Sequence, residues 1–138
     1  MMPIRMESDM VKLASLDDNI SIIDQLGENE SPVVLVNVLT ADPSEADNML
    51  AAWTRDAAFM KRQPGFIWTQ LHRGIGNSTT FMNYALWESV EAFKTAFENP
   101  EFRRHITDYP PSAVSRPHLF RKVSVPGSAF PVEPRRAS

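Results

Sequence analysis

Asn37 is the polar residue whose surroundings in the sequence most directly suggest chemistry. It interrupts an apolar, β-branched run between Val36 and Val38, where a buried amide must find hydrogen-bond partners. Because alternate residues of a strand share a face, Asn37 points to the same side as Leu35 and Leu39. Two interpretations stay open: an amide that binds a substrate oxygen or an oxygen intermediate, or a core amide bonded to a neighbouring strand or loop.

Trp87 ends a second run of strand character and shares its parity with Asn83. A tryptophan beside an amide can form the wall of a pocket for a flat aromatic molecule or a macrocycle. The alternative is a core residue that closes the sheet onto the following helix. Asn83 adds a second amide on the same face and favours the pocket.

His105 is the histidine with a candidate role. It lies on a short predicted helix after Pro100, where it could act as a base or as an axial haem ligand. The alternative is a surface histidine beside neighbouring arginines. His72 and His118 lie near strand ends and are interpreted as surface residues. No spacing among the three histidines predicts a zinc site, and no other metal site is predicted.

Aromatic side chains of the predicted sheet and helices would enclose an apolar space of the kind that binds small molecules, or else they form the core. They are Trp53, Trp68, Phe93, Phe97, Phe102 and Tyr109. Arg73 and Arg121 could reach an anionic group of a ligand, or they are solvated strand residues.

The composition excludes several classes of function. The chain has 138 residues, a net charge of −3 and no cysteine. It therefore offers no basic surface for nucleic acid, and no disulfide, thiolate chemistry or cysteine-bound zinc. No apolar run is long enough for a signal peptide or a membrane span. We expect a cytoplasmic protein without a nucleic-acid or membrane partner.

Turn and cap residues divide the chain into alternating strands and helices. Asp42 and Ser89 are placed to cap the two main helices, and Pro64-Gly65 ends the first of them. The pattern predicts strands at 32–40, 66–73, 79–87 and 118–125, helices at 43–62 and 90–98, and a short helix at 101–106.

This order, β-α-β-β-α-β, predicts an α+β fold of the ferredoxin-like type, with a four-stranded antiparallel sheet and both helices on one face. The other face would be a large apolar patch, which soluble monomers rarely expose. We therefore expect a homodimer that joins two sheets face to face.

Three regions are expected along the chain: an N-terminal extension at 1–31, the ferredoxin-like domain at 32–125 and a C-terminal tail at 126–138. The apolar residues of the extension favour a short amphipathic helix or an edge strand that covers the sheet or reaches the partner. The tail is rich in proline and is predicted to be disordered.

Four short motifs mark the domain: VLVNVL at 34–39, QPGF at 63–66, YALWESVEAF at 84–93 and NPEFRRH at 99–105. Together they resemble the antibiotic biosynthesis monooxygenase domain, over roughly residues 32 to 124. The resemblance implies a dimeric α+β barrel. It also implies a monooxygenase that oxidises a small aromatic substrate, a quinol or a phenol, without metal or flavin.

The resemblance also suggests site residues. Members that degrade haem use a strand asparagine, a tryptophan and a helix histidine. Asn37 and Trp87 match the first two, and His105 falls one residue out of register with the third. These three are the candidate catalytic residues. The candidate substrate-binding residues are Trp68, Asn83, Tyr84, Phe93 and Arg73. No cofactor is expected. Haem binding or degradation, and a non-catalytic small-molecule-binding barrel, are the alternatives.

Overall fold

The fold is built on a five-stranded sheet whose strand order is β1-β5-β2-β4-β3. The computed structural model describes residues 11–127. Strands β5, β2, β4 and β3 form the predicted antiparallel, ferredoxin-like sheet, so the α+β prediction is confirmed. The predicted sheet had four strands, and the fifth, β1 (Lys12–Leu13), comes from the N-terminal extension and pairs with β5 in parallel.

The central strand β2 (Val33–Thr40) lies between β4 (Thr80–Trp87) and β5 (Val114–Phe120). It is paired on both edges and rich in β-branched residues, which fit a pleated surface. The pairing register places Asn37 opposite Asn83 of β4 and Pro117 of β5.

The strand β3 (Phe66–Arg73) begins with an irregularity that alters the facing of its side chains. Phe66 pairs with Trp87, but Trp68 pairs with Leu86, so the register shifts between Phe66 and Trp68. The extra residue, Ile67, reverses the alternation of faces. Phe66 and Trp68 therefore lie on opposite faces of the sheet.

The helix α3 (Ala46–Met60) follows a short 3-10 helix, η1 (Pro43–Glu45). The predicted side-chain cap at Asp42 is wrong, because its carboxylate makes no capping hydrogen bond. The backbone N–H of Asp42 donates instead to the Ser112 hydroxyl (2.9 Å), which donates in turn to Glu45 (2.6 Å). The start of the helix is thus tied to a distant loop through Ser112.

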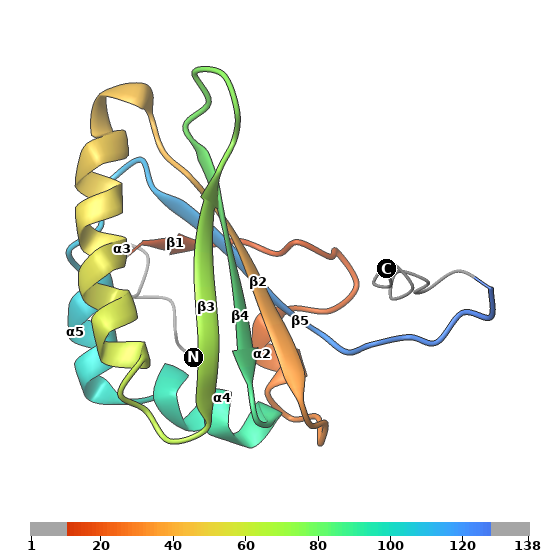
Figure 1. Ribbon diagram of the computed structural model, residues 1–138. Coiled ribbons are helices and arrows are strands. Elements are labelled where there is room, and N and C mark those ends of the chain that lie inside the picture. Colours follow the sequence, from red (N-terminus) through yellow and green to blue (C-terminus); the bar gives the residue numbers. More distant parts are fainter. Residues whose placement is uncertain (1–10, 128–138) are drawn as a thin grey trace, which may run out of the picture.

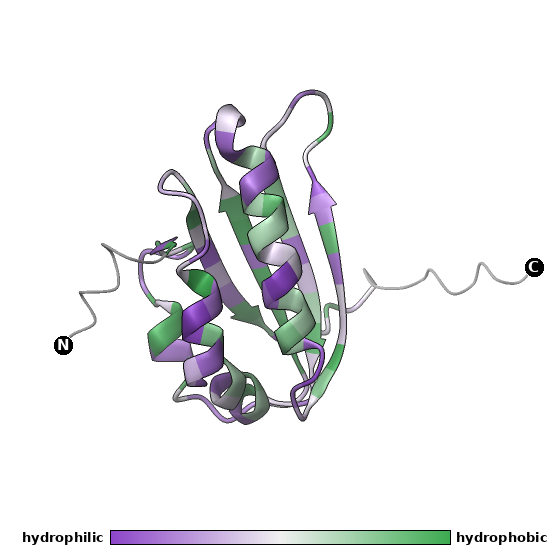
Figure 2. Cartoon of the chain, turned by 90° about the vertical axis from the view of Figure 1, so that its left-hand side faces the viewer, coloured by the Kyte–Doolittle hydropathy of each residue, from purple (hydrophilic) through white to green (hydrophobic). Residues whose placement is uncertain are grey.

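The helices α4 (Val90–Phe97) and α5 (Pro100–Ile106) each begin after a residue whose side chain caps the N-terminus. As predicted, Ser89 caps α4 by accepting from the backbone N–H of Ala92 at 3.0 Å. Asn99 caps α5 by accepting from the N–H of Glu101 at 2.8 Å. These helices and α3 all cover one face of the sheet, with α3 in front of it in Figure 2.

The last strand was predicted at 118–125 and is found at Val114–Phe120, so its bounds were wrong. Its partner β2 decides where it ends. Val34, next to the start of β2, pairs with Phe120, and the residues after Phe120 have no strand to bond. The residues after Phe120 have a sequence typical of a strand, but β2 does not extend far enough to pair with them.

The described part of the N-terminal extension runs along the outer edge of β5 (Figure 1). It contains β1 and a short helix, α2 (Ile22–Gln25), capped by Ser21. The Gln25 side chain accepts from the Leu119 N–H (2.8 Å) and donates to the Leu119 carbonyl (3.0 Å). Both a short helix and an edge strand are present, and together they cover the sheet edge.

The sheet face opposite α3, α4 and α5 is largely uncovered. Its half-buried residues are Val34, Val36, Val38, Met82 and Leu86, and its exposed large residues are Trp68, Tyr84 and Phe120. We refer to these eight residues as the open face. His118 lies on the same side but is 7% exposed, with its Nε2 3.3 Å from Gln25 Nε2. The prediction of a surface histidine at 118 was therefore wrong.

Two sequence predictions concern the ends of the chain and membrane association. Most of the tail predicted to be disordered, residues 128–138, lies outside the described residues. Within residues 11–127, no helix has the length and apolar character needed to cross a membrane.

Candidate functional site

A cavity of about 360 Å³ lies between the sheet and helices α3, α4 and α5, within the range of roughly 300–1,000 Å³ typical of small-molecule pockets. Most of its wall is apolar. Its polar lining side chains are Asn37, Asp56, Thr69, Asn83, Arg103, Tyr109 and Ser115. A few convergent polar groups in an apolar cavity are characteristic of a ligand site.

Two amides stand next to each other on the cavity wall. Asn37 and Asn83 are direct partners across β2 and β4. The Ser115 hydroxyl donates to Asn37 Oδ1 at 2.9 Å, and the Thr69 hydroxyl donates to Asn83 Oδ1. Within residues 11–127 neither amide nitrogen has a hydrogen-bond partner. The two oxygens are therefore held by the sheet, and the two N–H₂ groups are left for a ligand.

Aromatic rings wall the same cavity. Trp87 is 1% exposed and packs edge-on against Phe66 and Phe93, with ring centroids 5.4 and 5.5 Å away. Trp87 and Phe93, both predicted as site residues, therefore line the cavity together with Asn37 and Asn83. The packing on two sides makes the indole a rigid wall beside the amides.

The cavity also holds a buried carboxyl group that sequence reasoning did not identify as functional. Asp56 of α3 is 8% exposed, and the Tyr109 hydroxyl donates to its Oδ2 at 2.9 Å. Its Oδ1 is buried and has no hydrogen-bond partner among the described residues. Burial raises the pKa of Asp56 to about 7, against the lowering effect of the Tyr109 hydrogen bond and with a smaller rise from Asp108. Burial and the Asp56 charge also raise the Tyr109 pKa well above its ordinary value.

The sequence carries a signal for Asp56. Met49, Trp53, Asp56 and Met60 follow helical spacing, so the carboxylate lies on the stripe that faces the sheet. An acidic residue on an apolar stripe points to a function or a specific partner. Its partner Tyr109 is 53 residues away and could not be identified from the sequence.

Three predicted substrate-binding residues lie away from the cavity. Trp68 and Tyr84 contact each other on the open face, with ring centroids 5.7 Å apart. The register shift after Phe66 turns Trp68 away from the cavity. Arg73 lies at the end of β3, where its Nε donates to the Ser78 carbonyl (2.9 Å) and its guanidinium stacks over Phe81.

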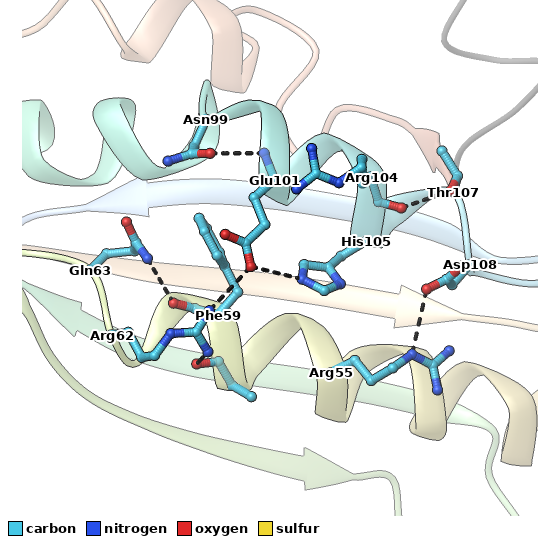
Figure 3. Close-up of polar contacts among 11 residues, drawn as sticks. Arg55, Phe59, Arg62, Gln63, Asn99, Glu101, Arg104, His105, Thr107 and Asp108 are labelled. Atoms are coloured by element: carbon cyan, nitrogen blue, oxygen red, sulfur yellow. Dashed lines mark hydrogen bonds and ion pairs between the residues drawn. The ribbon is translucent and has the colours of Figure 1, made fainter.

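The third predicted catalytic residue, His105, also lies outside the cavity. Figure 3 shows it between α5 and α3, with Nε2 3.5 Å from Glu101 Oε2. Glu101 also pairs with Arg62 at 3.1 Å. The imidazole packs against Phe59, with ring centroids 6.0 Å apart. His105 thus belongs to an ion-pair cluster that joins two helices.

The cavity does not provide the histidine that a haem iron would need. No histidine is among its lining residues, and His105 lies between α5 and α3, with its Nε2 3.5 Å from Glu101 Oε2. Within residues 11–127, no three histidine, aspartate or glutamate side chains gather in the way that a metal site requires. The described residues that line this cavity therefore do not fit a haem ligated by histidine.

The arrangement of sheet, helices and paired amides can be compared with known proteins. The sequence model of the antibiotic biosynthesis monooxygenase family matches residues 32–108, more than half of the chain. The chain belongs to the antibiotic biosynthesis monooxygenase family. The resemblance read from the four motifs is therefore confirmed.

Relatives within the antibiotic biosynthesis monooxygenase family support the assignment. Deoxynogalonate monooxygenase of Streptomyces nogalater is 33% identical over 96 residues, which cover 68% of this chain and 79% of that protein. The crystal structure of SnoaB, a cofactor-independent oxygenase from the same organism, is 30% identical with a TM-score of 0.60, and covers 71% of this chain and 99% of its own. A protein of known structure from Shewanella loihica PV-4 is 27% identical, with a TM-score of 0.60 over 72% of this chain and 100% of its own.

Part of the cavity lining of this family member precedes the family match in the sequence. Val11, Leu13 and Ile23 line it, but they precede residue 32, where the match begins. The N-terminal segment therefore adds apolar surface to a site whose amides and indole come from the shared domain.

Proposed function

We propose that this protein is a monooxygenase that transfers one atom of dioxygen to a small aromatic substrate, a quinol, a phenol or an anthrone, without metal or flavin. The observation that carries the proposal is the pair of amides, Asn37 and Asn83, whose free N–H₂ groups share an apolar, aromatic cavity. The similarity to a deoxynogalonate monooxygenase and to a cofactor-independent oxygenase supports the same class of reaction.

The substrate itself can supply the electrons. In an anthrone, the activated methylene loses a proton, and the electron pair left behind reduces dioxygen as a carbon–oxygen bond forms. Protonation gives a hydroperoxide, and loss of water from the hydroperoxide leaves a carbonyl group. One oxygen atom stays in the product and the other leaves as water, so the balance needs no external reductant.

The amides would act on the negative charge that this route creates. Two N–H donors fixed by the sheet can stabilise the oxygen of a phenolate or enolate as it forms, and such preorganised donors are effective in a cavity that excludes water. Trp87 and Phe93 would hold the flat ring of the substrate beside the amides. Aromatic walls and paired donors thus favour a planar substrate with an oxygen at its edge.

We further propose how the chain is organised around this site. Residues 32–125 would form the catalytic domain, with the segment before residue 32 closing part of the cavity. Two copies would join through the open face, because uncovered apolar sheet surface of this extent is unfavourable in water. Trp68 and Tyr84 would then be interface residues.

The proposal is tested by oxygen uptake with a panel of anthrone, naphthoquinols and benzoquinols under ¹⁸O₂. We expect protein-dependent uptake with at least one member and a product that gains one labelled oxygen atom. The protein should be as active after treatment with a metal chelator. If no member of the panel gives uptake above its own autoxidation, the proposed oxygenase activity is contradicted for these compounds.

A further inference from the structure

We propose that Asp56 is the base that removes the first proton from the substrate, with Tyr109 as its positioning residue. This inference rests on the proposed oxygenase function and names a catalytic group for it. Among the described lining residues, Asp56 is the one carboxyl group. The amides, hydroxyls and guanidinium beside it do not accept a proton readily.

The geometry leaves one carboxylate oxygen ready to accept a proton. Tyr109 donates to Oδ2 at 2.9 Å and thereby fixes the plane of the carboxylate. The other oxygen, Oδ1, is buried without a partner within residues 11–127. A buried acceptor without a hydrogen bond costs free energy unless a ligand satisfies it. A substrate O–H or acidic C–H in the cavity would do so.

Burial without a paired cation keeps Asp56 basic enough for this role. Arg55, its neighbour on α3, pairs with Asp108 at 3.5 Å, and Asp56 makes no ion pair within the described residues. Arg103 lines the same cavity from α5. A carboxylate removed from water and not paired with a cation holds its proton more tightly. The resulting pKa of about 7 suits general base catalysis near neutral pH.

Asp56 alone can accept and return both protons that the methylene loses. Asp56 takes the first proton of the methylene, and the carbanion's electron pair forms the carbon–oxygen bond to dioxygen. The protonated carboxyl then gives its proton to the peroxide anion. Asp56 next takes the second methylene proton as the oxygen–oxygen bond breaks, and returns it to the departing hydroxide as water. The carboxylate is restored at the end of the cycle.

The first test compares Asp56→Asn with Asp47→Asn, an exposed carboxyl of the same helix, in oxygen uptake with anthrone. Asparagine keeps the size of the side chain and can still accept from Tyr109, but it cannot take a proton. We expect kcat to fall by about 100-fold or more in Asp56→Asn and to stay within about twofold in Asp47→Asn. Full activity in a folded Asp56→Asn protein would overturn the proposal.

The second test separates proton removal from oxygenation. Anthrone is incubated in D₂O without oxygen, and deuterium entry at its methylene is followed by NMR against anthrone alone. We expect the wild-type protein to accelerate exchange and Asp56→Asn not to do so. Exchange without any oxygen uptake in air would support the base and contradict the oxygenase. No acceleration by the wild-type protein, or equal exchange in Asp56→Asn, would overturn the base.

Tyr109→Phe provides a readout that a purely structural role would not give. It keeps the Asp56 carboxylate but removes the hydrogen bond that lowers the pKa of that group. The rising limb of the exchange rate with pH should therefore move to higher pH in this variant. An unchanged limb would show that the titrating group is not Asp56. This comparison remains decisive if Asp56→Asn fails to fold.

Discussion

The paired amides show how single residues acquire a role from their neighbours. Asn83 is buried and Asn37 is half-buried, and an amide removed from water without a hydrogen-bond partner costs free energy. A hydroxyl from an adjacent strand satisfies each oxygen, Ser115 in one case and Thr69 in the other. The hydroxyls thus fix the amide orientation, and the donors that remain face no competing partner in the described part of the protein.

Replacement of one amide should affect chemistry more than stability. We expect Asn83→Ala to lower kcat/KM for the aromatic substrate by about 10²- to 10³-fold, the usual effect of removing one oxyanion donor. Oxygen uptake at varied substrate concentration measures this change. Asn77→Ala, in the exposed hairpin loop, is the matched control and should stay within about twofold. Equal activity of the two variants would contradict the role of the amide.

Asp56 should make stability depend on pH in an unusual direction. Its pKa is raised in the folded protein to about 7, whereas in the unfolded chain it is near 4. Between these values the folded state keeps a proton that the unfolded state loses, so the free energy of unfolding falls as pH rises from about 4 to 7. The rise in the Asp56 pKa limits this loss of unfolding free energy to about 4 kcal/mol at most.

Asp56→Asn should therefore be more stable than the wild type at pH 8, by about 1–4 kcal/mol, and nearly equal to it at pH 4. Urea unfolding at the two pH values measures the difference. Such a gain, together with lost activity, is the usual relation between stability and a functional residue. A difference that does not change with pH would contradict the raised pKa.

At the scale of elements, one turn holds the helix layer against the sheet. Gly65, between α3 and β3, has a φ of +88°, and a Cβ at this position would lie 2.4 Å from the Cβ of Ala92 in α4. The Gly65 carbonyl also accepts from the N–H of Glu88 at 2.8 Å. The absent side chain lets α4 approach the turn, close to the position of Trp87.

Gly65→Ala should destabilise the protein more than Gly76→Ala. Both glycines have positive φ, but a Cβ at Gly76 would meet nothing within 4 Å. We expect backbone strain of about 1 kcal/mol in both variants and an additional 1–3 kcal/mol of overpacking, an order-of-magnitude estimate, in Gly65→Ala. Thermal unfolding of the two variants measures the difference. Equal melting temperatures would show that α4 moves away from the added Cβ without loss of stability.

At the scale of the whole molecule, a single copy of the chain leaves one side of the sheet exposed to water. The helices α3, α4 and α5 all lie on one side (Figure 1), and the open face presents Trp68 at 47%, Tyr84 at 39% and Phe120 at 42% exposure. A second copy can cover this surface with the same residues, since a twofold interface is self-complementary.

A charged residue at the centre of the open face should therefore dissociate the proposed dimer. We expect the wild type to have twice the chain mass in size-exclusion chromatography with light scattering, and Tyr84→Lys to have the mass of one chain at micromolar concentration. Ile75→Lys, at a hairpin position that is 95% exposed, is the control and should remain dimeric. A monomeric wild type would contradict the proposed interface.

The sequence by itself determined the order of most helices and strands and which residues of β4 share the face of the site. Strand β3, the Ser89 cap and the order of elements follow from alternation, caps and turn residues, which act over a few positions. Strand parity also predicted that Asn83 and Trp87 point to one side. These features depend on local geometry, so a single sequence contains the information that specifies them.

Only the tertiary structure decided which residues meet. The register of β2 against β4 placed Asn37 beside Asn83, and the shift at Ile67 sent Trp68 to the open face. Tyr109 reached Asp56 across 53 residues, while His105 turned to Glu101 and Phe59 instead of the cavity. The physical reason is that register, bulges and helix docking are fixed by contacts between segments distant in sequence, and local patterns do not encode those contacts.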